Sequence, residues 1–323
     1  MPERQNRMGD IANDRLIALL EALGWEQQGD SDVDIPCELS AHHERDADHG
    51  VDGYMSYDDP YRERERGVVI ESKAKSWENT NDTSLQNGAS QALETLECIP
   101  ESDQFDEYLN NGVDRNVDLA ILGVWVHDGG FETSTFDEYV DELTIRNKRR
   151  KPFQVLVLGN RDLHRLASLH NQFSGLKESE FNGQYESLDF YYPSLPDTVS
   201  ERGELVALEY MLSDYIFAKG QKVEGEGPNS VSNDVNIVFY FDDIQRESLD
   251  FMFKALLEYQ MTDADEVWVY LDTRDQTEDF QLGSLIESFR QHTLPSDAPE
   301  FRFERLTQVD YDTYVDGMRG DSL

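Results

Sequence analysis

Acidic and basic residues in the first third of the chain have a spacing that could support chemistry on phosphates. The stretch GVVIESKAKSW at 67–77 carries Glu71, Lys73 and Lys75 at alternate positions, which share one face if the stretch is a β-strand. Asp52 lies in the preceding extended stretch, and an antiparallel hairpin would bring it beside Glu71. Two carboxylates can hold a hard divalent cation, and an ammonium group can orient a water molecule or stabilise charge that develops on a phosphate.

A helix, three strands, a helix and a strand are predicted to position these side chains. Residues 9–24 have apolar side chains at helical spacing, and a glycine stands at the predicted helix end. Extended stretches are predicted at 34–40, 51–57 and 67–75, a periodic apolar stretch at 85–99, a strand at 117–126, a helix near 135–147 and a strand at 152–159. This order predicts an α/β fold with a mixed sheet flanked by helices.

The second half of the chain has a pattern of its own. Residues 171–200 show no sustained period and contain two prolines, so they are interpreted as a linker between a domain at 1–170 and a domain at 201–323. Helices are predicted at 201–218, 245–260 and 279–291, and strands at 236–241, 266–271 and 301–306. Strands separated by helical stretches predict parallel pairing, and therefore a smaller α/β domain of unknown role.

Residues 9–126 resemble the PD-(D/E)XK nuclease superfamily, whose restriction-endonuclease-like core has the element order αβββαβ. Asp52, Glu71 and Lys73 match the acidic residue and the Glu-x-Lys of its motif, although no proline precedes Asp52. The resemblance implies a metal-dependent endonuclease in which Asp52 and Glu71 bind Mg²⁺ or Mn²⁺. It also implies that Lys73 assists the water molecule that attacks the phosphodiester.

The stretches HGVDGYMSYDDPY and GVVIESKAKSW are most similar to nucleases of two-gene anti-phage systems. This similarity implies a role in defence against phages or plasmids, with nucleic acid as substrate and DNA favoured over RNA. It also implies a second protein subunit encoded nearby, or a homodimer, as partner.

Two further residues are candidates for accessory roles. Asp14 is the favoured fourth ligand because members of the superfamily often add an acidic residue from the first helix, but it also fits a solvated face of an acidic protein. Gln91 lies where related nucleases carry a glutamine near the site, and an ordinary surface amide explains it equally well.

A dense cationic segment is the candidate nucleic-acid contact. Residues 146–151 read RNKRRK and include Lys148, Arg149, Arg150 and Lys151. One or two cations would suffice to complement a helix C-terminus, so five indicate contact with phosphates or with an acidic partner.

Two rival interpretations belong to other classes of function. The carboxylates of Asp242, Asp243 and Asp272 follow predicted strands, where an α/β sheet usually binds ligands, but helix capping or solvation explains them better. The other rival is a catalytically inactive nuclease fold that binds nucleic acid or a protein. The presence of Asp52, Glu71 and Lys73 together disfavours it.

Composition indicates where such a protein would work. The 323 residues carry a net charge of −39 with 38% hydrophobic residues, which indicates a folded protein adapted to molar salt, as in a halophilic archaeon. Cys37 and Cys98 are too few for a disulfide framework or a cysteine-rich metal site. No apolar run is long enough to span a membrane and the N-terminus lacks an apolar signal core, so a cytoplasmic location is expected.

Overall fold

The chain folds into two compact units. The computed structural model describes residues 2–43, 48–62, 64–103, 105, 117–145, 152–194, 199–224, 230–274 and 279–320. Unit 1 comprises Met1–Arg165 and Tyr311–Leu323, and unit 2 comprises Leu166–Asp310. The chain therefore leaves unit 1 once and returns to it at its end. None of the described helices has the length and apolar character that crossing a membrane requires.

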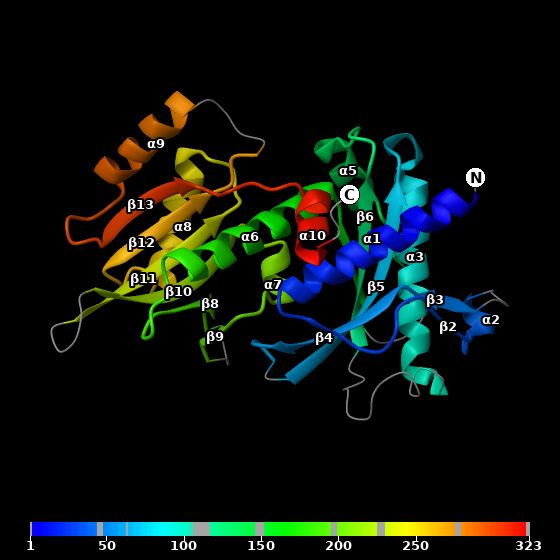
Figure 1. Cartoon of the computed structure of the whole chain (residues 1–323). Helices are drawn as coiled ribbons and strands as arrows, with labels where there is room; N and C mark the ends of the chain where they lie inside the picture. The colour runs from blue at the N-terminus through cyan, green and yellow to red at the C-terminus, as the bar shows by residue number, and fades with distance from the viewer. Residues whose placement is uncertain are drawn as a thin grey trace. The chain divides into compact units, whose positions relative to one another are not determined.

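Unit 1 is built on a five-stranded mixed sheet (Figure 1). Its strands, in spatial order, are β1 (Glu26–Gln27), β4 (Gly53–Asp59), β5 (Arg64–Lys75), β6 (Val117–Val126) and β7 (Gln154–Leu158). β4 runs antiparallel to β1 and β5, whereas β6 runs parallel to β5 and β7. The predicted mixed sheet is confirmed.

The extended stretch expected at 34–40 does not join this sheet. Only β2 (Val33–Ile35) is a strand, and it pairs with β3 (His49–Val51) in a separate two-stranded sheet. Pro36 follows β2 directly and has no N–H to continue a ladder, and the chain then turns into the short helix α2 (Ser40–His43). The first strand of the main sheet is instead β1.

Helices α1 (Pro2–Ala22) and α3 (Asp82–Cys98) cover opposite faces of the sheet (Figure 1). Successive residues of β6 show this arrangement. Leu122 packs against Gly88 of α3, whereas a Cβ atom placed on Gly123 would meet Leu16 of α1. Side chains of β6 on the same side as Leu122 therefore face α3, and so do those of the β5 residues paired with them.

The remaining helices of unit 1 differ in part from expectation. α5 (Thr133–Asp141) ends before residue 147, and residues 146–151 lie outside the described part of the chain. α10 (Tyr311–Arg319), for which no helix was expected, packs on α1 through an ion pair in which Arg15 Nε lies 2.7 Å from Asp316 Oδ1. Tyr311 is buried edge-on against Trp125, and its N–H donates to His164 Nδ1 at 2.9 Å.

Unit 2 contains a six-stranded sheet in the order β13-β12-β11-β10-β8-β9. Its elements are β8 (Ser187–Tyr192), β9 (Glu201–Gly203), α7 (Leu208–Met211), β10 (Tyr215–Glu224), β11 (Val231–Tyr240), α8 (Arg246–Glu258), β12 (Glu266–Leu271), α9 (Asp279–His292) and β13 (Glu300–Arg305). The parallel pairing of β11, β12 and β13 confirms the expected α/β layer.

Two sequence-based interpretations in this half are wrong. Residues 171–200, expected as a linker, include the end of α6 (Asn160–Ser179) and all of β8. Residues 201–218, expected as a helix, form β9, α7 and the start of β10. The cause is tertiary, because β10 pairs with β11 on one side and β8 on the other.

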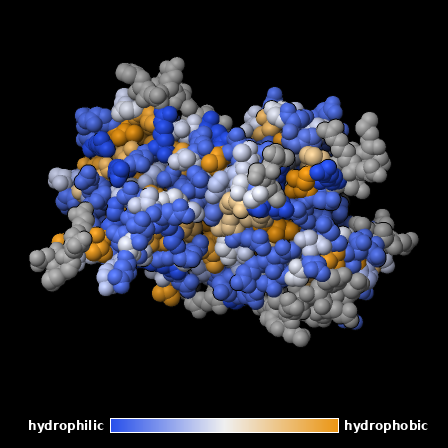
Figure 2. Space-filling view, in the orientation of Figure 1, coloured by the Kyte–Doolittle hydropathy of each residue, from blue (hydrophilic) through white to orange (hydrophobic). Residues whose placement is uncertain are grey.

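The surface reflects the acidic composition. Figure 2 shows a face that is mostly hydrophilic, with hydrophobic residues in small separate groups. Exposed large hydrophobic side chains are spread along the chain, among them Tyr185, Val231 and Phe251. Scattered exposure of this kind is normal and needs no functional explanation.

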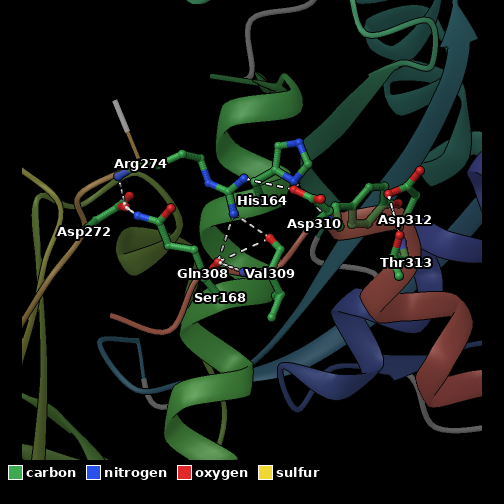
Figure 3. Close-up of polar contacts among 10 residues, drawn as sticks. His164, Ser168, Asp272, Arg274, Gln308, Val309, Asp310, Asp312 and Thr313 are labelled. Carbon is green, nitrogen blue, oxygen red and sulfur yellow. Dashed lines mark hydrogen bonds and ion pairs between the residues drawn. The ribbon is translucent and has the colours of Figure 1, made fainter. Parts of the chain in front are cut away.

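Arg274 fixes the last segment of unit 2 before the chain returns to unit 1 (Figure 3). Its guanidinium donates to Asp310 Oδ1 at 3.1 Å and to the Val309 carbonyl at 2.5 Å. Val309 N donates in turn to Ser168 Oγ at 3.1 Å. Hydrogen bonds therefore join the first residues of unit 2 to its last residues.

Candidate active site

Asp52 and Glu71 lie together at the end of the β4–β5 pair. Gly53 of β4 is the register partner of Ile70 of β5, so Asp52 and Glu71 continue this antiparallel register by one residue. Ser72 N donates a 2.6 Å hydrogen bond to Asp52 Oδ2. The hairpin therefore brings the two predicted carboxylates to one edge of the sheet, as expected.

Lys73 lies two residues beyond Glu71 on the same side of β5. Glu71 is 0% exposed and is the register partner of Leu122, whose side chain faces α3. Lys73 Nζ forms an ion pair with Glu71 Oε1, and 31% of the Lys73 side chain is exposed. β5 thus passes from the core to the surface within the Glu-x-Lys motif, so the ammonium group connects a buried carboxylate with solvent.

The charges of the site shift the pKa values of Asp52 and Lys73. Burial raises the pKa of Asp52 above its ordinary value, while Lys73 and the Ser72 N–H oppose that rise. Burial alone would lower the pKa of Lys73, but the Glu71 and Asp52 carboxylates outweigh it and raise that pKa. Lys73 is therefore an ammonium ion at neutral pH, a hydrogen-bond donor rather than a base.

Lys75 differs from Lys73 in its surroundings. It is half-buried at the end of β5, where its register partner is Val126 of β6. Burial and the neighbouring charge of Lys73 lower the pKa of Lys75. It stands about 6 to 7 Å further along the strand than Lys73, a position suited to a neighbouring phosphate.

Asn13 and Asp32 are residues of the site that the sequence analysis missed. Asn13, buried on α1, donates from Nδ2 to the Asp52 carbonyl at 2.7 Å and to Asp32 Oδ1 at 3.4 Å. Asp32 N donates to the same Asp52 carbonyl at 3.3 Å. Asn13 and Asp32 therefore fix the backbone that carries Asp52. Their roles depend on contacts 19 to 39 residues apart, which no local spacing indicates.

Acidic residues of α1 do gather near this edge. Burial raises the pKa of Asp32, and the charges of Asp52, Asp10 and Asp14 add to the rise. Asp14 itself accepts a hydrogen bond from Arg319 of α10 at 3.0 Å, and half of its side chain is exposed. The structure therefore places Asp14 in the acidic neighbourhood of Asp52 but with a cationic partner of its own.

The other predicted residues have the following positions. Gln91 is half-buried on α3, one turn after Gly88, which packs on the register partner of Glu71. The candidate nucleic-acid contacts Lys148, Arg149, Arg150 and Lys151 lie outside the described residues.

The carboxylates of Asp242 and Asp272 in unit 2 accept hydrogen bonds from protein groups. Asp242 Oδ2 accepts from the Tyr215 hydroxyl at 3.0 Å, and Asp242 Oδ1 accepts from Asp243 N at 2.7 Å. Asp272 Oδ1 accepts from Arg274 N at 3.0 Å. The contacts from Asp243 N and Arg274 N fix the turns after β11 and β12, which favours the structural interpretation over a second active site.

The donor set of Asp52 and Glu71 fits a hard divalent cation. Both side chains offer carboxylate oxygens, the ligands that Mg²⁺ and Mn²⁺ prefer. Two carboxylates, one of them fully buried, face a single ammonium group, so the site keeps an excess of negative charge. A cation would offset the cost of this burial.

Comparison with known families identifies the region that contains this site. A family model described as "GAPS4 protein PD-(D/E)XK nuclease domain" matches residues 1–162, half of the chain. The match includes all five strands of the main sheet and ends inside α6. No curated protein matches the chain.

Proposed function

The chain belongs to the family of GAPS4 proteins with a PD-(D/E)XK nuclease domain, and we propose that it is a metal-dependent endonuclease acting in defence against phages or plasmids. DNA is the favoured substrate. The observation that carries the proposal is the convergence of Asp52, Glu71 and Lys73 at the end of the β4–β5 pair.

Asp52 and Glu71 would hold Mg²⁺ or Mn²⁺ through their carboxylate oxygens. When bound, the cation supplies Lewis-acid stabilisation of the charge that develops on the scissile phosphate. The Ser72 N–H orients the Asp52 carboxylate, and Asn13 holds the Asp52 backbone. The binding groups are therefore ordered before the cation arrives, which lowers the entropic cost of binding.

Lys73 contributes as a donor of hydrogen bonds. Because its pKa is raised, its ammonium group keeps its protons at neutral pH and can orient the attacking water or stabilise a phosphate oxygen. A lysine would need a strongly lowered pKa to abstract a proton, and the shift at Lys73 has the opposite direction.

Substitution of four residues of the site separates metal binding from the chemical step. Asp52→Asn and Glu71→Gln should each abolish Mn²⁺ binding and cleavage, because the cation loses a charged oxygen ligand. Lys73→Ala should bind Mn²⁺ but cleave about 10²- to 10⁴-fold more slowly, and Lys75→Ala should lose less activity. Calorimetric Mn²⁺ titration and a cleavage assay on double-stranded DNA, single-stranded DNA and RNA measure both properties.

Glu65→Gln is the matched control. Glu65 lies on β5 with the same side-chain parity as Glu71 but near the opposite end of the strand, so its loss should change neither property. Full cleavage by Glu71→Gln would refute the nuclease proposal, and full cleavage by Lys73→Ala would refute the role of that residue. Metal-independent nucleic-acid binding without cleavage would indicate the inactive module instead.

The segment with Lys148, Arg149, Arg150 and Lys151 is proposed to bind substrate phosphates. Reversal of Arg149, Arg150 and Lys151 to glutamate should weaken DNA binding for all sequences and reduce its salt dependence, because phosphate contacts release counterions. Fluorescence anisotropy at several salt concentrations measures this. Equal binding by variant and parent would assign the segment to complementing a helix end.

Partner and host are also proposed. The similarity to nucleases of two-gene systems supports a second protein subunit or a homodimer, and the net charge of −39 supports a halophilic archaeal host.

A further inference from the structure

Four side chains of unit 1 that the proposed nuclease chemistry does not use converge on one point. Cys37, His43, His49 and Cys98 each offer one ligand atom, and these atoms all lie within 4.8 Å of one another. They come from the loop after β2, from α2, from β3 and from the last residue of α3. Cys37 and Cys98, which lie 61 positions apart in the sequence, therefore bring their sulfurs to the same point as the two histidine nitrogens.

Four of the six separations among the ligand atoms are close to those of a tetrahedral centre, and the other two are within 4.8 Å. A zinc ion with Zn–S near 2.3 Å and Zn–N near 2.0–2.1 Å would place its sulfurs about 3.8 Å apart and each sulfur about 3.5 Å from a nitrogen. Cys37 Sγ and Cys98 Sγ are 4.0 Å apart. The sulfur–nitrogen distances are 3.3 Å for Cys37–His43, 3.6 Å for Cys98–His43 and 3.4 Å for Cys98–His49.

A carboxylate supports one of the histidines from the outer side. His43 directs Nδ1 toward the two sulfurs, while its Nε2 lies 2.8 Å from Glu97 Oε2. Glu97 and His43 are both buried. A carboxylate on the distal nitrogen fixes the tautomer and orientation of a metal-binding imidazole, and it is a regular companion of zinc-bound histidine.

We propose that Cys37, His43, His49 and Cys98 bind one structural Zn²⁺ ion. Two sulfurs with two imidazoles form a donor set that selects zinc over the hard cation proposed for Asp52 and Glu71. Four protein ligands fill a tetrahedral shell and leave no position for substrate, and three of the four residues are buried. The ion therefore stabilises the fold rather than taking part in catalysis.

The site has a specific place in the architecture. β2, α2 and β3 form an excursion between β1 and β4, and zinc would hold this excursion to the end of α3. β3 ends at Val51, immediately before Asp52. Zinc would thereby restrict the backbone that delivers the first carboxylate of the active site, while contributing no ligand to it.

The experiment measures zinc directly. The full chain, purified in molar KCl under reducing conditions without a metal-affinity resin, should contain one zinc per chain by plasma mass spectrometry. Replacement by Co²⁺ should give the visible absorption of tetrahedral cobalt with a thiolate charge-transfer band. Cys37→Ser and Cys98→Ser should lose the zinc, and Glu97→Gln should lower zinc affinity about 10- to 100-fold in a chelator competition.

His292→Ala, in unit 2, is the control and should retain one zinc per chain. A parent protein that lacks zinc and gives no thiolate–cobalt band would overturn the proposal, whether or not the cysteine variants fold. Zinc retained in both cysteine variants would overturn it as well. None of these readouts depends on nuclease activity, so the two proposals fail separately.

Discussion

At the scale of single residues, the position of Asp52 favours function at the expense of stability. Burial raises the pKa of its carboxyl group, so ionised Asp52 is less favourable in the folded chain than in the unfolded chain. The same burial creates the demand for a cation. A site of this kind is expected to gain stability when its charge is either removed or complemented.

Asp52→Asn should therefore unfold at a higher temperature than the parent in metal-free buffer at neutral pH. The asparagine oxygen can still accept the hydrogen bond from Ser72 N. At a pH well below 3.8, the ordinary pKa, Asp52 is protonated in both states and the difference should vanish. As pH rises past this value the unfolded chain ionises first, so the parent loses stability relative to the variant until the folded pKa is passed.

Differential scanning calorimetry in molar KCl with EDTA, from pH 2 to pH 7, tests this expectation. Asp58→Asn removes an equal charge from an exposed position on β4 and should change stability by less than about 0.5 kcal/mol. A lower unfolding temperature for Asp52→Asn at neutral pH would mean that attraction to Lys73 outweighs burial.

The site residues that the sequence indicated were found by rules that act over a short stretch of chain. Asp52, Glu71 and Lys73 were predictable because strand alternation and a hairpin are short-range rules. Asn13 and Asp32 were not, since their contacts follow from the packing of α1. The number of cysteines alone argued against a cysteine-rich metal site, and this argument left out His43 and His49, which have no common zinc-finger spacing with Cys37 and Cys98.

At the scale of elements, the contact of α1 with the sheet depends on a missing side chain. A Cβ atom on Gly123 of β6 would lie 2.5 Å from Leu16 Cδ2, in the buried interface that carries α1. The close approach of this helix brings Asn13 to the Asp52 backbone. Helix position and active-site order are therefore linked through one glycine.

Gly123→Ala should destabilise unit 1 by about 1–3 kcal/mol, because an added methyl group overpacks a filled core. Gly9→Ala is the matched control, since Gly9 lies within α1 and a Cβ atom there meets nothing within 4 Å. It should stabilise the protein by about 0.5–1 kcal/mol. Denaturant titrations in molar KCl measure both changes, and equal effects of the two substitutions would exclude the proposed role of Leu16.

Element prediction succeeded where the local pattern and the tertiary environment agree. β6 is apolar and buried at every position except Asp118, and α3 has apolar periodicity with a capping box between Asn81 and Ser84. The prediction failed for β10 because the stretch YIFAKGQKV has an ambiguous pattern, which only pairing with two neighbouring strands resolves.

At the scale of the whole molecule, chain order and domain order differ. α10 belongs to unit 1 although it follows all of unit 2, and its partners Arg15 and Trp125 lie about 190 to 300 residues earlier. A short terminal helix of this kind carries no sequence signal for the domain it joins. The boundaries of unit 2, after Arg165 and after Asp310, were therefore not recoverable from composition or periodicity.

The net charge of −39 has a physical consequence for both units. Exposed carboxylates repel one another over about 30 Å in 0.01 M salt but over only about 3 Å in 1 M salt. Cations to neutralise them are few, since the chain has 28 lysines and arginines against 67 acidic residues. Repulsion is therefore expected to oppose compaction in dilute buffer.

We expect the protein to keep its tertiary structure in molar KCl and to lose it on transfer to about 10 mM salt, where charges repel across the full width of a helix and its neighbours. Near-ultraviolet circular dichroism reports this loss, because Trp25 stacks on Tyr57 in unit 1 and Trp268 packs against Phe181 in unit 2. Sucrose at equal osmolality is the control. It strengthens burial by exclusion from the protein surface but screens no charge, so it should not substitute for KCl. A spectrum that is unchanged after desalting would show that packing alone outweighs the repulsion, and it would remove the basis for a halophilic host.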